Sequence, residues 1–598
     1  MEGDGEHPAN ALLRASSPYL RAHAHDPVRW RAWSDETFAE AKESDRPIFL
    51  SVGYQSCHWC HVMQRESFKD EQVAEILNSD FIPVKVDREV RPDVDALYMA
   101  YVQAVTGSGG WPMSVFLTPD LEPFFGGTYF PPVSPAPRIP SFKDVLELAR
   151  HRWQHARAHT REVARDAMEY LAMHFTPKGP APWDRKFIED ARTRVMAMRD
   201  EEHGGFGTAP KFPMATTVEF LLALHDAWAD EEALRTALRA VLAQLHGGIW
   251  DQVEGGLFRY STDDEWLVPH FEKMLYDQAL MLTLCARLYE ETQADEFAEA
   301  AEALVRFLEA RLASPDGVFY SSLDADTEGV EGATYVWRYE DLADALTQEE
   351  LALAREWLGV SERGNWEGRL NILTRRAGAH GPRAELDGVL AKLARRRDSR
   401  PQPDVVENVI VSWNALLAKE LVEAGKAIGS DSLVRRGVSL VDTLLASARQ
   451  DGKVLHILDA GTSDGVALLE DAAFLAAASL SAGEATGRDD LIDEADRIHT
   501  RACGEFVSTG GARSPDGFVM STASELPLLP LEQSDSPTPS GASTLAENEW
   551  RLALALEREP SEALIEAVQY QLGAAARVAP HLCGASLAVA VRRMSGAG

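Results

Sequence analysis

The chain contains 598 residues, of which 45% are hydrophobic and 26% are charged, a composition typical of globular proteins. This length exceeds what one hydrophobic core usually organises, so we expect at least two domains. The 94 acidic residues outnumber the 59 basic ones and give a net charge of −35, which argues against nucleic-acid binding because phosphate contacts need clustered Lys and Arg.

Strand-like and helix-like segments alternate through the first part of the chain. Residues 46–54 are a short apolar run closed by turn residues, and they predict a buried strand that ends just before two cysteines. The elements predicted after it are a helix over 61–78, a strand over 81–87, a helix over 92–105, a hairpin over 113–130 and a helix over 141–156. The order β-α-β-α-β-β-α indicates an α/β domain.

A stretch rich in Pro and Gly at 176–184 is typical of a linker. Beyond it, amphipathic helices alternate with loops that contain Gly and aromatic residues. Two-helix units joined in this way predict a closed ring of helical hairpins with its loops at one rim, and a plain helical solenoid is the alternative. We therefore expect one domain over residues 1–175 and a second over 184–598.

The number of cysteines and the first residues of the chain indicate in which cellular compartment we expect the protein. Five cysteines in so long a chain do not form a disulfide framework, and three of them lie in apolar, helix-like stretches. The first ten residues resemble no signal peptide, and no run of about 18 apolar residues predicts a membrane span. We therefore expect a cytoplasmic protein that has no membrane or nucleic-acid partner. Its acid-rich balance, with Arg preferred over Lys, suits a salt-adapted organism, and a GC-rich genome would explain the Arg preference equally well.

The stretch CHWCH at 57–61 has three competing interpretations. It fits the attachment pattern of a c-type haem, a Cys/His metal site and the dithiol of a thioredoxin-like protein. A haem is disfavoured by the missing export signal, and a metal site by the lack of a second pair of ligands. A purely structural dithiol remains open, and neither a metal nor a cofactor is expected.

A C-x-x-C that follows a strand and opens a helix favours redox chemistry. The free N–H groups at the helix start stabilise a thiolate on Cys57, and Cys60 lies in the first turn, where it can resolve a mixed disulfide. His58 is expected to tune the pKa of Cys57. Later in the chain, Trp111-Pro112 immediately precedes a predicted strand, the place where thioredoxin-like folds carry a cis-proline, so we predict a cis bond there and a substrate-clamping role for Pro112.

Longer motifs give the chain a family resemblance. RPIFLSVGYQSCHWCHVMQRESFKD at 46–70, GGWPMSVFLTPDLEPFFGGTYFPP at 109–132 and GGIWDQVEGGLFRYSTDDEWLVPHFEKMLYDQAL at 247–280 resemble the spermatogenesis-associated protein 20 family, and matching strings run through nearly the whole chain. The resemblance implies a thioredoxin-like domain followed by an all-α (α/α)6 toroid similar to sugar epimerases and six-hairpin glycosidases. It implies no established reaction.

Toroids of this kind work at a loop-lined mouth with His and carboxylate side chains. The candidate mouth residues in this sequence are Asp251, Arg259, His270, Glu272, Asp277, Asp324, Asp326 and Glu331. If one helix begins near Pro269, His270 and Asp277 share a face of it. Trp250, Tyr260, Trp266 and Tyr335 suit stacking on a sugar ring. For each of these residues, helix capping or core packing is the alternative.

The C-terminal part departs from the family pattern. The family's Asp-Lys is Glu407–Asn408 here, its Asp-Asp-Tyr-Ala is 470–473 with the sequence EDAA, and its Pro-Ser-Gly-Asn ends in Ala542. The mouth has therefore lost polar groups that sugar chemistry needs, whereas the dithiol shows no such loss.

Three functions remain open. The first is thiol–disulfide exchange at Cys57 and Cys60 with a protein partner that the toroid selects. The second is a carbohydrate-active toroid with a small sugar substrate, the thioredoxin-like domain being structural or regulatory. The third is a redox-sensing scaffold without catalysis.

Overall fold

The computed structural model describes residues 7–136, 139–375, 383–450, 452–458, 466–511 and 513–596. Contacts divide the chain into two compact units. Unit 1 consists of residues 1–177, 455–468 and 505–531, and unit 2 of residues 178–454, 469–504 and 532–598. No pattern in the sequence indicated that the two later segments belong with the N-terminal part. None of the described helices is both long and apolar enough to cross a membrane.

A four-stranded sheet forms the centre of unit 1, in the order β2-β1-β3-β4. The strands are β1 (Ile48–Gly53), β2 (Ile82–Asp87), β3 (Met113–Leu117) and β4 (Pro123–Gly127). β1 runs parallel to β2 and antiparallel to β3, which in turn pairs antiparallel with β4. Every residue of β1, β2 and β3 is buried, as their apolar runs predict.

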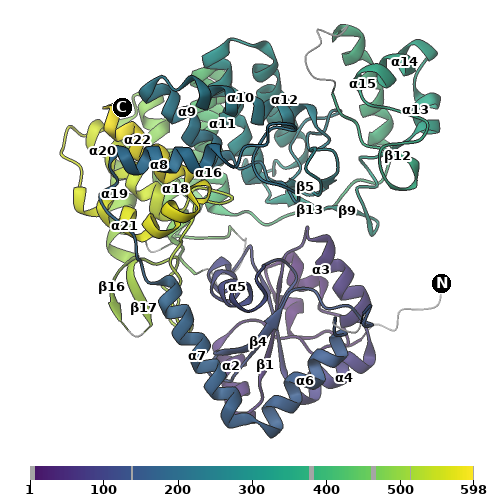
Figure 1. Cartoon of the computed structure of the whole chain (residues 1–598), viewed down its shortest axis with the longest axis vertical. Helices are drawn as coiled ribbons and strands as arrows, with labels where there is room; N and C mark the ends of the chain where they lie inside the picture. Colours follow the sequence, from purple (N-terminus) through teal and green to yellow (C-terminus); the bar gives the residue numbers. More distant parts are fainter. Residues whose placement is uncertain are drawn as a thin grey trace. The chain divides into compact units, whose positions relative to one another are not determined.

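Helices cover this sheet, as Figure 1 shows. They are α2 (Asp35–Ser44), α3 (His58–Met63), α4 (Glu71–Asp80), α5 (Pro92–Thr106), α6 (Phe142–His155) and α7 (Arg157–Phe175). An aromatic core that includes Trp30, Phe49 and Phe116 packs between sheet and helices. The thioredoxin-like element order predicted from the sequence is confirmed, although the helix expected over 61–78 is divided into α3, a π-helical turn and α4.

The segment 505–531 belongs to unit 1 through specific contacts. It contains the hairpin of β16 (Val507–Gly511) and β17 (Ser514–Phe518). Arg91 bridges Asp93 and Glu525, and Ser521 donates a hydrogen bond to the second oxygen of Asp93. Asp93 is fully buried, so these bonds satisfy a charge that has no access to water.

Unit 2 is a closed ring of six inner helices. They are α9 (Ala215–Trp228), α11 (Leu275–Thr292), α16 (Val411–Ala427), α18 (Leu469–Thr486), α20 (Gly541–Ala555) and α22 (Gly584–Ser595). Each contacts the next in this order, and α22 contacts α9. The (α/α)6 toroid is therefore confirmed, and a solenoid, which does not close, is excluded. Inner helices α16 and α18 are buried on nearly all sides, which explains their almost continuous apolar sequences.

An outer layer of helices surrounds the ring. Its members are α8 (Arg185–Met196), α10 (Glu231–His246), α12 (Asp295–Arg311), α17 (Asp431–Ser447), α19 (Asp489–Glu505) and α21 (Glu562–Val578). Amphipathic sequences fit this position because only one face of each helix meets the inner layer. Inside the ring, residues of all six inner helices line a cavity of about 1080 Å³. Its charged side chains pair with one another, as Arg592 does with Glu547 and Arg551 with Glu484.

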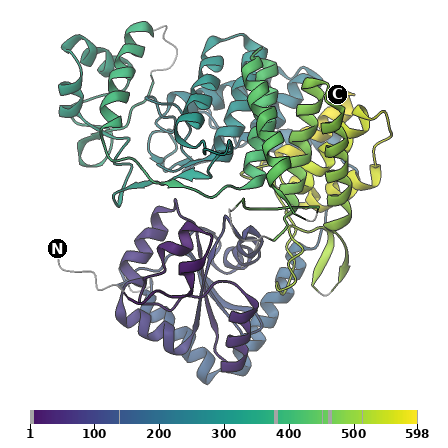
Figure 2. The same ribbon diagram turned by 180° about the vertical axis from the view of Figure 1, so that it is seen from behind.

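Three further helices form a small cluster beside the ring, visible in Figures 1 and 2. They are α13 (Tyr339–Ala345), α14 (Gln348–Trp357) and α15 (Arg383–Asp398), and they share a core of their own around Trp337. Arg397, near the end of α15, points away from this core and reaches Asp251.

Candidate functional site

The two cysteines of unit 1 lie where β1 passes into α3. Cys57 is the N-cap of α3, and its Sγ accepts the backbone N–H of Cys60 at 3.2 Å. The two sulfur atoms are joined in a disulfide, with Cα atoms 5.3 Å apart. An N-terminal helix position provides unpaired N–H groups and the positive end of the helix dipole, both of which favour a thiolate on Cys57 after reduction.

Aromatic rings enclose the disulfide. Tyr19, Tyr54 and Trp111 pack with Cys57 and Cys60 in one buried cluster. The Trp111–Pro112 peptide bond is cis, which confirms that prediction. The Trp111 ring lies 5.8 Å from that of Tyr54, and its Nε1 donates a hydrogen bond to Asp95 Oδ1 at 2.8 Å. The residue before the proline is therefore held in place from two sides.

The two residues between the cysteines differ in exposure. His58 is half-buried, with its ring 5.8 Å from the Trp59 ring. Trp59 is 49% exposed, and its other neighbour is the ring of Tyr129 at 5.1 Å. Both cysteines are buried, whereas Trp59 between them leaves a large apolar surface exposed.

A buried polar layer lies beneath the disulfide, and the sequence analysis missed it. Lys85, on β2, is fully buried and donates to Ser51 Oγ at 3.1 Å across the β1–β2 pair. Burial lowers the pKa of Lys85 to about 7. The rings of Tyr19, Trp30 and Phe68 lie within 5.1 Å of its Nζ. A lysine within the apolar strand IPVKVD was the available signal, because lysine is rarely buried without a role.

A second buried pair joins this layer. His23 Nδ1 lies 2.6 Å from Asp26 Oδ2, which also accepts the indole N–H of Trp30. Burial and the neighbouring Lys85 lower the pKa of His23 to about 3, so this histidine is neutral. Burial raises the pKa of Asp26, but the hydrogen bonds from His23 and Gln64 and the neighbouring charge of Lys85 together outweigh it, so the net pKa is lowered.

Asp251, one of the predicted mouth residues of unit 2, is buried and belongs to a network of ion pairs. It lies bidentate with the fully buried Arg397, and its Oδ2 also accepts from Lys273 at 2.8 Å. Burial opposes its ionisation, but Arg397 and Lys273 outweigh this and lower the pKa of Asp251. Because both of its carboxylate oxygens accept hydrogen bonds from these side chains, Asp251 connects α15 to the loop that follows α10.

Four of the predicted residues come together in one cluster. His270 Nδ1 lies 2.6 Å from Glu331 Oε1, and its Nε2 lies 3.5 Å from Glu272 Oε1. Glu272 also accepts from Arg259 at 2.8 Å. Burial lowers the pKa of His270, but Glu272 and Glu331 outweigh it, so the net pKa is raised.

Asp277 lies beside this cluster, in the first turn of α11. The expectation that it shares a helix with His270 is wrong, because His270 belongs to the short strand β6 (Pro269–His270) and α11 begins only at Leu275. Burial raises the pKa of Asp277 well above its usual value, against the opposing effect of Arg259.

The remaining acidic candidates lie on the neighbouring ribbon. Asp326, on β9 (Asp326–Thr327), pairs in register with Glu331 of β10 (Val330–Glu331). Asp324 Oδ1 accepts the backbone N–H of Asp326 at 3.0 Å. Asp324 therefore shapes the turn that leads into the ribbon, and the ribbon brings Glu331 to His270.

Of the aromatic residues predicted to stack on a ligand, three are buried in the protein. These are Trp250, Trp266 and Tyr335. Tyr260 is different, because it is half-buried and stacks on His270 at 5.0 Å. Its other side stacks on Phe212, which is 43% exposed. A column of three rings thus runs from solvent to His270.

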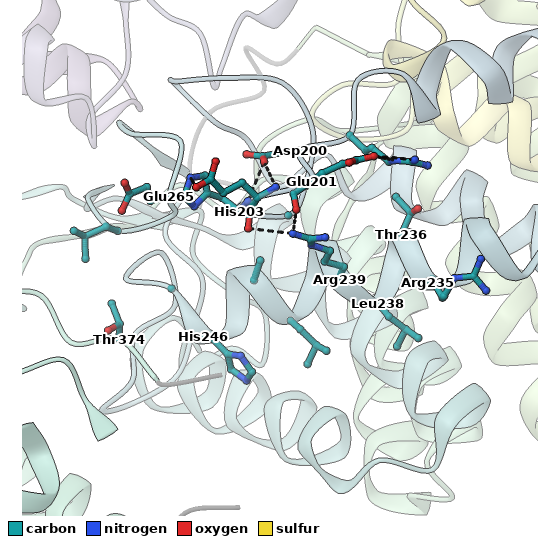
Figure 3. Close-up of a pocket in the computed structure, with 18 of the residues that line it drawn as sticks. Asp200, Glu201, His203, Arg235, Thr236, Leu238, Arg239, His246, Glu265 and Thr374 are labelled. Atoms are coloured by element: carbon teal, nitrogen blue, oxygen red, sulfur yellow. Dashed lines mark hydrogen bonds and ion pairs between the residues drawn. The ribbon is translucent and has the colours of Figure 1, made fainter. Parts of the chain in front are cut away.

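A separate cavity of about 1060 Å³ lies beside α10 and is drawn in Figure 3. Two of its arginines bond within the protein: Arg199 to Glu232 at 2.6 Å, and Arg239 to the backbone carbonyl of Glu202 at 3.1 Å. None of the residues predicted from the sequence lines this cavity.

Comparisons with known proteins bear on both units. A family model described as Thioredox_DsbH, protein of unknown function DUF255, matches residues 9–172. Spermatogenesis-associated protein 20 of Homo sapiens is 33% identical over 92% of this chain and 77% of its own length. The protein of that name in Rattus norvegicus is 34% identical over 91% and 75%. A crystal structure of D-mannose isomerase aligns with 66% of this chain and 86% of its own, at a TM-score of 0.43 and 10% identity.

Proposed function

The chain belongs to the spermatogenesis-associated protein 20 family, and from that premise we propose that it carries out thiol–disulfide exchange on a protein partner that the ring of unit 2 selects. Its N-terminal unit is thioredoxin-like. The observation that carries the proposal is the position of Cys57 at the start of α3, bonded to Cys60 one helical turn later. Such a pair can cycle between dithiol and disulfide without moving the backbone far.

The exchange proceeds in two displacements. In the reduced protein the Cys57 thiolate attacks a disulfide of the partner, whose S–S bond breaks; one partner sulfur leaves as a thiolate and the other becomes bonded to Cys57. The Cys60 sulfur, after losing its proton, then attacks Cys57 and releases the second partner thiol. Two electrons pass to the partner, and the Cys57–Cys60 disulfide forms again.

The surroundings of the pair support this assignment of roles. The helix start lowers the energy of a thiolate on Cys57, whereas Cys60 lies deeper, next to Tyr19 and Gly53. Trp59 offers an exposed apolar contact beside the reacting sulfur. A protein with an extended, partly apolar segment around its cysteine is the partner that fits.

Reduction of insulin disulfides by dithiothreitol tests the proposal, with full-length protein as the catalyst. We expect wild-type protein to accelerate the reaction at least tenfold and Cys57→Ser to abolish the acceleration. Cys60→Ser should accumulate a mixed disulfide with insulin, detectable by mass, because its resolving thiol is missing. Mass spectrometry after alkylation should find Cys57 and Cys60 blocked as a disulfide before reduction and labelled after it.

The matched control is Cys503→Ser, which alters a partly buried thiol of α19 and should leave the rate unchanged. Unchanged acceleration by Cys57→Ser would sink the proposal, and so would a wild-type rate no higher than that of dithiothreitol alone.

A further inference from the structure

An arginine lies at the same edge of the central sheet of unit 1 as the disulfide. Arg88 is the first residue after β2, and its backbone N–H donates to the Gly53 carbonyl at 2.9 Å, at the end of β1. Because β1 and β2 are parallel, their carboxyl ends meet at one edge, and β1 leads from this edge to Cys57. Strand pairing therefore brings Arg88 close to the dithiol, although the two lie far apart in the chain.

The guanidinium group of Arg88 stacks on the aromatic rings that enclose the disulfide. Its Cζ lies 3.9 Å from the centre of the Trp111 ring and 5.3 Å from the centre of the Tyr54 ring. Both rings belong to the cluster around Cys57 and Cys60. A planar guanidinium that stacks on a tryptophan is attracted to the ring face, and the N–H groups at its edges stay available for hydrogen bonds.

The terminal N–H groups of Arg88 are not used within the described part of the chain. The one acidic contact of this side chain there joins Nε to Asp95 Oδ2 at 3.9 Å, which is too long for a hydrogen bond. The other oxygen of Asp95 accepts the indole N–H of Trp111 at 2.8 Å. The Arg88 side chain is 19% exposed, so it is within reach of a molecule bound at the disulfide.

The segment that carries the cysteines also favours an acidic group. It contains His58, His61 and Arg65, and no acidic residue precedes Glu66 in α3 or in the turn after it. Glu66 in turn accepts a hydrogen bond from the hydroxyl of Tyr129. The whole chain has a net charge of −35, but this segment does not repel a carboxylate.

We propose that Arg88 makes the exchange selective for partner disulfides whose cysteine is flanked by Asp or Glu. This inference rests on the function proposed above and names its substrate class. A carboxylate close to the partner cysteine accepts two hydrogen bonds from the guanidinium while the cysteine sulfur meets Cys57. Arg88 does not touch the reacting sulfur atoms, so it determines specificity and is not a catalytic residue. The carboxylate binds before the exchange begins, so the selectivity appears in KM rather than in kcat.

Peptide disulfides test this selectivity, with full-length protein as the catalyst and dithiothreitol as the reductant. The probes are symmetric disulfide dimers of one short peptide that carries Glu, Gln or Lys on both sides of its cysteine. Chromatography follows their reduction, and each rate is corrected for the rate with dithiothreitol alone. We expect kcat/KM to be at least tenfold higher for the Glu peptide than for the Gln peptide, because a hydrogen bond to a charged group is worth about that factor, and lowest for the Lys peptide.

Variants of Arg88 should change this preference and not merely the rate. Arg88→Gln should bring the ratio of kcat/KM for the Glu and Gln peptides to about one, and Arg88→Glu should make the Lys peptide the best substrate. The matched control is Arg150→Gln, because Arg150 pairs with Glu147 on the surface of α6 and its loss should leave the ratio unchanged. Equal kcat/KM for the Glu and Gln peptides, or the same ratio in Arg88→Gln as in wild type, would overturn the selectivity alone.

A binding measurement separates recognition from exchange. Fluorescence anisotropy should show that the reduced Glu peptide binds Cys57→Ser protein at least tenfold more tightly than the reduced Gln peptide. Adding Arg88→Gln to this protein should remove the difference. If no peptide disulfide is reduced faster than by dithiothreitol alone, the exchange itself is refuted, and the binding of the two peptides still decides the role of Arg88.

Discussion

Lys85 Nζ lies 3.1 Å from Ser51 Oγ, and this is its one hydrogen bond among the described residues of the chain. An ammonium group has three protons to donate, so a fully buried lysine with a single acceptor is poorly satisfied in its charged form. Tyr19, whose ring faces the same Nζ, packs against Cys57 and Cys60. A titratable amine is thus separated from the disulfide by one aromatic ring.

Replacing Lys85 should make stability less dependent on pH. Burial lowers the pKa of Lys85 to about 7 in the folded protein, whereas the unfolded chain holds the proton to about pH 10. Wild-type stability therefore gains from this group as the pH rises between about 7 and 10. Lys85→Met should stabilise the protein at pH 6, and that advantage should shrink by about 2–3 kcal/mol at pH 9. The midpoint of urea unfolding at the two pH values measures it.

Lys42→Met is the control for Lys85, because the Lys42 side chain is 58% exposed and its replacement should change stability equally at both pH values. A Lys85→Met advantage that is the same at pH 6 and pH 9 would show that the lysine is charged throughout.

Gly53 allows Tyr19 and Cys60 to approach each other at the end of β1. A Cβ at this position would stand 2.4 Å from Tyr19 Oη and 2.8 Å from Cys60 Sγ. Gly53→Ala should therefore lower the free energy of unfolding by about 1–3 kcal/mol. Tyr19→Phe removes the nearest atom, so the alanine should cost less in that background, by about 1 kcal/mol in a double-mutant cycle followed by urea unfolding.

The control for Gly53 is Gly388→Ala in α15, where a Cβ meets open space and helix propensity favours alanine. It should be neutral or stabilising. Additive effects of Gly53→Ala and Tyr19→Phe would contradict the proposed contact.

Local patterns predicted most of the fold but few of the partners. The β1–α3 turn and the helical ring follow from periodicity and turn residues close together in the chain, and the cis Trp111–Pro112 bond follows from the place of a cis-proline in thioredoxin-like folds. The partner of Asp251 could not be found in this way, because Arg397 lies 146 residues later. Likewise, an aromatic residue in a Gly-containing loop looks the same in the sequence whether it stays half-buried against His270, as Tyr260 does, or closes a core, as Trp266 does.

Arg397 should be among the residues on which unit 2 depends most. It is 1% exposed and bonds both oxygens of Asp251 and one of Glu254. Arg397→Met leaves these carboxylates with fewer partners in a buried place, which costs about 3–5 kcal/mol. The loss is read from the urea midpoint of full-length protein.

An exposed arginine provides the comparison for Arg397. Arg185 pairs with Glu189 one turn along α8, its side chain is 65% exposed, and Arg185→Met should cost less than about 1 kcal/mol. A similarly small loss for Arg397→Met would mean that the buried network contributes little.

Asp277→Asn should stabilise the protein at neutral pH. Burial raises the pKa of Asp277 well above its usual value, so the folded protein keeps a proton that the unfolded chain releases near pH 4. Folding is therefore penalised increasingly as the pH rises above about 4, until the folded group also ionises. An asparagine has the shape of the protonated acid and carries no such penalty.

The difference in urea midpoint between Asp277→Asn and wild type should be larger at pH 7 than at pH 4, whereas Asp316→Asn, at an exposed turn, should show no change with pH. A smaller difference at pH 7 than at pH 4 would mean that Asp277 is ionised in the folded protein.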